Sequence, residues 1–104
     1  MKNNFLEEEE CPVKRSLNIL GGKWKLRIIG QIGIEIRRYG DLKRQIPDIS
    51  EKMLIQELKS LVEFNILDKK SYNEIPPKVE YSLTKKGLKV LPILESLSEF
   101  GKEN

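Results

Sequence analysis

The sequence predicts a mainly helical α+β fold, and three observations indicate it. Two amphipathic segments, Tyr39–Ile46 and Glu51–Asn65, stand on either side of the four-residue turn Pro47–Ser50. The apolar period then changes from about 3.6 residues to two, which is typical of paired strands. This last segment, Leu67–Leu83, is a hairpin rich in lysine. Helix, tight turn, helix and basic hairpin in this order describe a winged helix-turn-helix, a shape that places one helix in the major groove of DNA.

Composition favours one small, charged domain. The chain has 104 residues, 38% hydrophobic and 34% charged, which suits one domain and is too short for two ordinary ones. The net charge is +3, and the acidic run Glu7–Glu10 near the start leaves the excess positive charge to the rest of the chain. A basic body suits a polyanion such as nucleic acid, and charge alone would suit a membrane surface too. We expect an acidic flexible leader over residues 1–10 and one domain over residues 11–104.

Features that the sequence lacks predict the location of the protein and the kinds of catalytic or metal site that it does not have. No apolar run approaches the roughly 18 residues that span a bilayer, and the acidic leader is no signal peptide, so we expect a cytoplasmic protein. There is no histidine, the commonest general base, and Cys11 is the one cysteine. An internal disulfide and a multi-cysteine zinc site are therefore excluded. Gly21-Gly22-Lys23 lacks the spacing and the Ser/Thr of a phosphate-binding loop. We predict neither an enzyme nor a cofactor nor a metal site.

The N-terminal part predicts two helices. Pro12 suits the first turn of the first helix, with Cys11 as its cap, and Gly21-Gly22 ends it. A second helix is expected to begin near Lys23, and Gly33–Arg38 is short enough to hold an extended stub. The apolar faces of the two helices are Val13, Leu17 and Leu20 in the first and Trp24, Ile28, Ile29 and Ile32 in the second.

The third and fourth helices form the predicted helix-turn-helix, residues 39–65. Pro47 ends the third, and Ser50 is a strong N-cap for the fourth, worth about 1 kcal/mol. Ile49 before the cap and Leu54 after it form a hydrophobic staple. The fourth helix is predicted to bury Leu54, Leu58, Leu61 and Val62 and to expose Lys52, Gln56, Lys59 and Glu63, with Met53 and Ile55 at the margins.

The C-terminal part predicts a two-stranded wing, residues 67–83, and a last helix, residues 84–100. The tip of the wing is Asn73–Pro77, whose two prolines cannot join a strand ladder. Thr84 is expected to cap the last helix, Pro92 to bend it and Gly101 to end it. Its apolar residues cover an arc too wide for one neighbour: Leu88, Val90, Leu91, Ile93, Leu94, Leu97 and Phe100. Such a helix usually contacts a second subunit as well, so we predict a dimer.

Seven segments in order carry a family resemblance: Cys11–Val13, Leu20–Lys25, Arg37–Leu42, Ile49-Ser50, Leu54–Leu58, Pro76-Pro77 and Val79–Thr84. Together they resemble the HxlR-type transcriptional regulators, prokaryotic relatives of the MarR winged-helix proteins, over residues 11–101. The resemblance implies a homodimer, joined through the first and last helices, that binds an inverted-repeat operator near promoters. Some members of the family repress and others activate. Some sense electrophiles or oxidants through the cysteine that matches Cys11.

The predicted DNA contacts fall into three groups. They are Ser50, Glu51, Lys52, Met53, Gln56 and Lys59 in the recognition helix, Lys69, Lys70 and Lys78 in the wing, and Arg37, Arg38, Lys43 and Arg44 against the DNA backbone. Gln56 can bond bidentately to adenine and a lysine to guanine, each worth about 1–3 kcal/mol of discrimination. Each group also has a simpler interpretation as solvated surface, and the wing lysines as protection against strand aggregation.

Two interpretations of Cys11 stay open. The helix dipole together with Lys14 and Arg15 favours a reactive thiolate, whereas Glu7–Glu10 disfavour it. Alternatively Cys11 is a small residue packed at the dimer seam. The predicted seam comprises Val13, Leu17, Leu91, Leu94, Leu97 and Phe100.

The sequence as a whole predicts a homodimeric, sequence-specific DNA-binding regulator, with repression as its expected mode. Its expected partners are a near-palindromic duplex, a second copy of the chain, and a small electrophile or oxidant. The alternative is a winged-helix module that binds protein partners without specific DNA binding.

Overall fold

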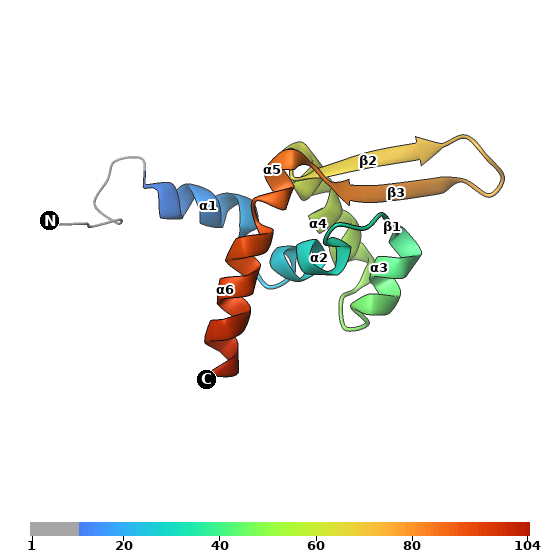
Figure 1. Cartoon of the computed structure of the whole chain (residues 1–104). Helices are drawn as coiled ribbons and strands as arrows, with labels where there is room; N and C mark the ends of the chain where they lie inside the picture. The colour runs from blue at the N-terminus through green and yellow to red at the C-terminus, as the bar shows by residue number, and fades with distance from the viewer. Residues whose placement is uncertain (1–10) are drawn as a thin grey trace, which may run out of the picture.

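The computed structural model describes residues 11–104, so the expected leader, residues 1–10, lies outside the described residues. A long hairpin projects from one side of a helical body, and both terminal helices lie at the other side (Figure 1). The elements in order are α1 Pro12–Leu20, α2 Lys25–Ile32, β1 Arg37–Arg38, α3 Tyr39–Gln45, α4 Glu51–Glu63, β2 Leu67–Tyr72, β3 Lys78–Leu83, α5 Lys85–Leu88 and α6 Leu91–Lys102. The predicted winged helix-turn-helix is confirmed.

The first two helices form as expected, with one shift. Cys11 is the N-cap residue of α1, and its side chain makes no capping hydrogen bond. Gly22 has a φ of +99°, a conformation that glycine adopts without strain, and it lies in the connection to α2. α2 begins at Lys25 rather than near Lys23, and Trp24 is its N-cap residue.

The sheet has three strands rather than the two of the wing alone. β3 lies in the middle of the order β1-β3-β2, and all pairs are antiparallel. Arg37 of β1 and Lys69 of β2 both stand opposite Tyr81 of β3. The stub predicted within Gly33–Arg38 is therefore a real strand. Its pairing was not predicted, because two residues are too few to show an alternating pattern.

One hydrophobic core joins α2, α3, α4 and the base of the wing. Its buried members are Ile28, Ile29, Ile32, Leu42, Ile46, Ile49, Leu54, Leu58, Leu61, Ile66, Leu67, Tyr81 and Val90. Burial of each large apolar side chain contributes about 1.5–3 kcal/mol before the cost of ordering the chain. Because the buried face of α4 supplies three of these residues, the opposite face of α4 is held outward.

The prediction of a single last helix is wrong. The segment forms two helices, α5 and α6, which are separated at Lys89-Val90. Pro92 stands in the first turn of α6, where a missing N–H costs no hydrogen bond, so the chain breaks before the proline instead of bending around it. Thr84 does cap α5, since its Oγ1 accepts a hydrogen bond from the Gly87 N–H at 2.9 Å. Gly101 lies inside α6, which ends at Lys102.

An ion pair that the sequence did not predict joins α2 to α4. Lys25 Nζ lies 2.6 Å from Glu57 Oε1, and the two side chains are only 15% and 12% exposed. Glu57 stands on the core-facing side of α4, between the buried Leu54 and Leu61. The pair thus fixes the recognition helix to the helix behind it.

We expect Glu57→Leu to lower the free energy of unfolding by about 3 kcal/mol, because it leaves the Lys25 ammonium poorly solvated without its partner. The double variant Lys25→Met/Glu57→Leu should recover most of that loss, since both charges are then removed. Urea denaturation of the three proteins measures the two differences. A double variant no more stable than Glu57→Leu would contradict this explanation.

Candidate nucleic-acid interface

The start of α4 is built as the sequence predicts. Ser50 Oγ accepts a hydrogen bond from the Met53 backbone N–H at 3.1 Å. Ile49 and Leu54 are both buried on either side of this cap, as expected for a hydrophobic staple. The helix N-terminus is therefore fixed, and its hydroxyl cap keeps a proton that it can donate outward.

The predicted recognition residues divide between the surface and the core. Glu51, Lys52, Gln56 and Lys59 are exposed. Met53 is half-buried and packs against the core cluster, so it is turned away from the outer face. The outer face of α4 thus presents cations and an amide, which are donors for phosphates and for base edges.

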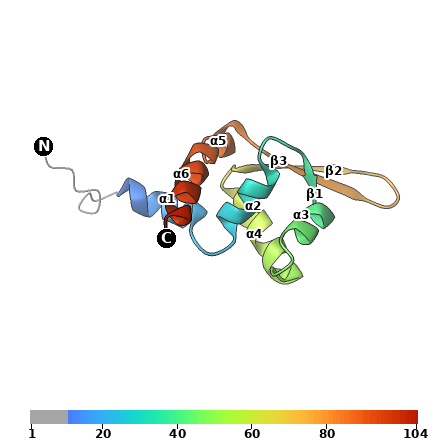
Figure 2. The ribbon, with the colours of Figure 1, turned by 60° about the horizontal axis from the view of Figure 1, so that its bottom comes forward.

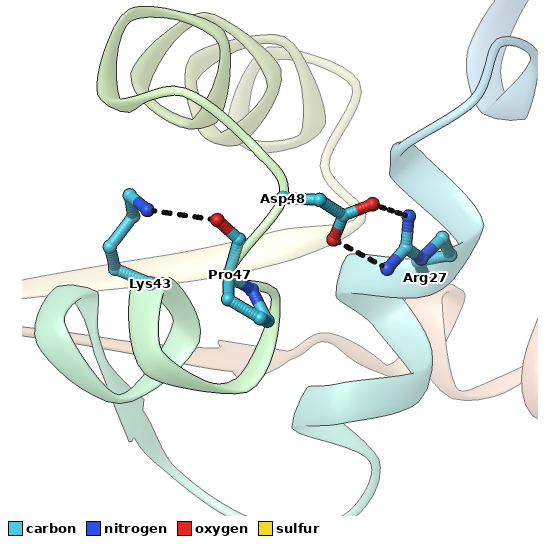
Figure 3. Close-up of polar contacts among 4 residues, drawn as sticks. All are labelled: Arg27, Lys43, Pro47 and Asp48. Carbon is cyan, nitrogen blue, oxygen red and sulfur yellow. Dashed lines mark hydrogen bonds and ion pairs between the residues drawn. The ribbon is translucent and has the colours of Figure 1, made fainter.

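The turn between α3 and α4 is tied to α2. The Arg27 guanidinium donates two hydrogen bonds to the Asp48 carboxylate, at 3.1 and 3.0 Å, and Lys43 Nζ donates to the Pro47 carbonyl at 3.5 Å (Figure 3). Arg27 also lies over the Trp24 ring, 5.1 Å from its centroid. Sequence reasoning missed Arg27 and Asp48, since opposite charges 21 positions apart give no periodic signal. Two parallel hydrogen bonds fix orientation as well as distance, so the turn is held in place.

Some of the residues predicted to contact the DNA backbone already make hydrogen bonds within the protein. Asp41 caps α3 by accepting from the Arg38 N–H at 2.9 Å, and it also accepts from the Arg44 guanidinium at 2.7 Å. Arg37 donates from Nε to the Gln31 carbonyl at 3.0 Å. The Arg38 side chain is exposed. Guanidinium groups have five donors, so Arg37 and Arg44 keep spare N–H groups for phosphate.

The outer face of the wing holds a polar cluster. Tyr72 Oη donates to Glu80 Oε1 at 2.8 Å, and Lys78 Nζ lies 4.2 Å from the centre of the Tyr72 ring. Lys78 also stands 3.9 Å from Glu80 and 4.0 Å from Glu74, with 23% of its side chain exposed. Of the three predicted wing lysines, Lys78 is therefore neutralised within the wing. Lys69 and Lys70 are exposed.

A cleft of about 270 Å³ separates α4 from the inner face of the wing. Lys69 faces it, because it stands opposite the core-facing Tyr81 in the strand register. Leu58 and Val62 contribute apolar surface, and Lys59 contributes a second cation from α4. The cleft thus combines an apolar wall with positive charge from two elements.

The terminal helices present a separate, apolar surface. α1 and α6 both lie at the end of the molecule opposite the wing, where α6 crosses near the C-terminal end of α1 (Figure 1, Figure 2). Between them is a cleft of about 390 Å³, lined by Val13, Leu17, Leu20, Leu26, Ile93 and Leu97 among others. Leu17, Leu97 and Phe100 are exposed, whereas Leu91 and Leu94, predicted at the same seam, pack against the core of their own chain. Cys11, at the start of α1, is 6% exposed.

Two further features of the described residues bear on other functions. Within residues 11–104 no helix is both long and apolar enough to cross a membrane. Over the same residues, no three histidine, cysteine or acidic side chains gather in a way that could hold a metal ion.

Known proteins resemble the chain over nearly its whole length. The profile of a family described as HxlR-like helix-turn-helix matches residues 19–104. A protein of Fusobacterium mortiferum, provisionally named regulatory protein MalR, is 45% identical over 96 residues, which are 91% of each chain. The crystal structure of a MarR-family protein from Porphyromonas gingivalis W83, provisionally a transcriptional regulator, has a TM-score of 0.90 and 56% identity, covering 100% of this chain and 99% of that one. The oxidised form of the redox regulator HypR has a TM-score of 0.85 and 36% identity, covering 90% and 97%.

The hydrogen bonds between Arg27 and Asp48 make the stability of the fold depend on pH in the acidic range. The Arg27 guanidinium, chiefly through its hydrogen bonds, holds the pKa of Asp48 below the ordinary 3.8. The stability that the carboxylate provides is therefore complete above this value and is lost as the pH falls through the lower pKa of the folded state. We expect Asp48→Asn to be less stable than the parent at pH 7, with the difference shrinking below about pH 4. Urea denaturation at a series of pH values measures it.

Arg27→Gln is the matched variant, because it removes the cause of the lowered pKa and keeps the carboxylate. Its acid dependence should match that of Asp48→Asn. An Arg27→Gln protein with the parent's acid dependence would show that another group is responsible.

Proposed function

The chain belongs to the HxlR-like helix-turn-helix family of transcriptional regulators, and from this premise we propose that it is a homodimeric repressor of a near-palindromic operator. The observation that carries the proposal is the outer face of α4. It presents Lys52, Gln56 and Lys59 to solvent, while the opposite face is buried in the core. A helix held this way can enter a major groove without losing order.

Within this proposal the recognition helix reads bases and also grips the backbone. The Gln56 amide pairs bidentately with adenine, and Lys52 or Lys59 pairs with guanine. Ser50 and the N–H groups at the start of α4 bind a phosphate, which the helix dipole favours. Glu51 lies beside them and can accept from the amino group of a cytosine.

The wing and α3 position the protein on the duplex. Lys69 and Lys70 contact phosphates or the adjacent minor groove, while Lys78 holds the wing in shape through its carboxylate partners. Arg38 binds the backbone from the start of α3, and Arg37, Lys43 and Arg44 add contacts through their spare donors. These contacts carry affinity rather than sequence preference.

The apolar face of α1 and α6 supports a dimer. Leu17 and Phe100 are 62% and 67% exposed, and Leu17 lines the cleft between the two helices together with Val13 and Leu97. A second copy related by a two-fold axis would cover this face and set the two α4 helices about 34 Å apart, one turn of DNA. Such a dimer would act on the chromosome in the cytoplasm.

Control by oxidants or electrophiles is the second part of the proposal. Cys11 starts α1, the helix assigned to the seam, and HypR is a redox regulator with the same fold. Because each chain has one cysteine, oxidation joins two Cys11 thiols between subunits, or one thiol to a small thiol. Two thiols then lose two protons and two electrons to the oxidant. The low exposure of Cys11 means that the start of α1 must open for this to occur.

A module that binds protein partners is the competing function, and one observation favours it. Ile34 and Ile36, in the connection between α2 and β1, are 83% and 61% exposed and lie outside the terminal helices. Such a module would associate with duplexes weakly and without dependence on salt.

We expect chromosomal fragments recovered with the protein to share an inverted repeat, bound with a steep salt dependence. Each phosphate neutralised contributes about −0.9 to the slope of log affinity against log salt. Lys70→Ala should weaken all duplexes evenly and reduce the slope, whereas Gln56→Ala should keep the slope and relax the sequence preference. Titrations at four salt concentrations measure both quantities.

A flat salt dependence would favour the protein-binding module. Equal behaviour of Lys70→Ala and Gln56→Ala would refute the division between backbone contact and base contact. Sedimentation at the titration concentrations completes the test, because a stable single subunit would contradict the paired arrangement.

We expect Cys11→Ser to bind the operator as the parent does and to lose any response to diamide or hypochlorite. Gel-shift titration before and after treatment measures the response, and a non-reducing gel detects a disulfide between subunits. A response that persists in Cys11→Ser would place the sensor elsewhere.

A further inference from the structure

Ile55 is the apolar residue of α4 that the core does not use. The remaining large apolar side chains of the helix are buried or half-buried: Met53, Leu54, Leu58, Leu61 and Val62. Ile55 is 56% exposed and is not part of the core cluster. A single exposed isoleucine is ordinary on a protein surface. This one, however, stands at the margin of the outer face of α4, where it lines the cleft between α4 and the wing.

Two of the neighbours of Ile55 along α4 are cations, and a third, Glu51, is an anion. Lys52 lies one turn before it and Lys59 one turn after it, and residues at these spacings share one side of a helix. Ile55 also lines the cleft between α4 and the wing, to which Lys59 and Lys69 contribute their side chains. Lysines from two elements thus stand beside this apolar group, with Glu63 as an acidic side chain that also lines the cleft. The excess of positive charge suits a polyanion that carries apolar groups of its own, rather than an uncharged protein surface.

Duplex DNA carries one such apolar group on its base edges. The C5-methyl group of thymine projects into the major groove and distinguishes thymine from the other bases there. The polar neighbours on the outer face, Lys52, Gln56 and Lys59, suit the polar atoms of the base edges. Ile55 stands in the first half of α4, the part of a recognition helix that reaches the bases.

We propose that Ile55 determines specificity by packing against the methyl group of a thymine in each half-site. The proposal rests on the DNA-binding function above and adds one base preference to it. In this arrangement Lys69 of the wing binds the DNA backbone beside the cleft, and Ile55 contacts the thymine methyl group at the edge of the cleft.

The test uses the duplex recovered with the protein, in which thymines are replaced one symmetric pair at a time by deoxyuridine, which lacks the methyl group. One buried methyl group changes a binding constant about fourfold. At one symmetric pair we therefore expect the parent protein to bind about fifteenfold more weakly. Ile55→Ala should bind the thymine and deoxyuridine forms of that pair equally, and should respond to the other positions as the parent does.

Ile34→Ala is the matched control, because it shortens an isoleucine that is also exposed but stands far from α4 in the sequence. It should keep the parent's ratio of thymine to deoxyuridine binding. Thermal unfolding of both variants should stay close to the parent, since neither side chain is part of the core.

The outcomes distinguish a failure of the proposed DNA-binding function from a failure of the proposed role of Ile55. A parent protein that prefers no duplex overturns the proposed DNA-binding function itself. A parent that prefers its duplex but tolerates deoxyuridine at every position overturns only the role of Ile55. An Ile55→Ala protein that keeps the parent's fifteenfold ratio does the same.

Discussion

The orientation of α4 depends on how that helix is fastened to α2. Apolar burial holds the two helices together, but it is non-directional and would tolerate small rotations of α4 about its axis. The contact between Lys25 and Glu57, at 2.6 Å on the core side of α4, is directional. The two hydrogen bonds from Arg27 to Asp48 fix the preceding turn in the same way. One helix thus sets both the rotation and the starting point of the recognition helix, and the side chains on its outer face inherit that setting.

The wing shows how the chain limits its own positive charge. Glu74 and Glu80 stand within 4.0 Å of Lys78, and the Tyr72 ring lies beneath the same ammonium group. Such a cluster gives a long hairpin some rigidity, since a pair of strands alone is marginal in water. It also leaves Lys78 less exposed than Lys69 and Lys70. In the proposed complex Lys69 and Lys70 of β2 contact the duplex, and the cluster around Lys78 stabilises the hairpin.

The local signals of the sequence were enough for the helix-turn-helix and the wing, because caps, prolines and periodicity act within a few residues. Ser50, Pro47 and the change of period after α4 all act where they were expected to act. The contacts across the chain were not predictable in this way. Nothing in a single sequence pairs Glu57 or Asp48 with a residue of α2. Pro92 suits either a kink or a helix start, and in the structure it stands in the first turn of α6, which follows the buried Val90 and begins at Leu91.

Because α1 is short and exposed, its stability depends on contacts with other parts of the structure. α1 has nine residues, none of them buried, and isolated helices shorter than about 12–15 residues are marginal in water. Its order must therefore come from packing, and among the described residues Ile19 and Leu20 are partly buried against the core of the same chain. In the proposed dimer a second subunit would supply the rest, so that folding of α1 and assembly would be one process. Cys11 stands at the first turn of this helix, where an added group or a bond would act on the order of α1 and, through the seam, on the spacing of the two recognition helices.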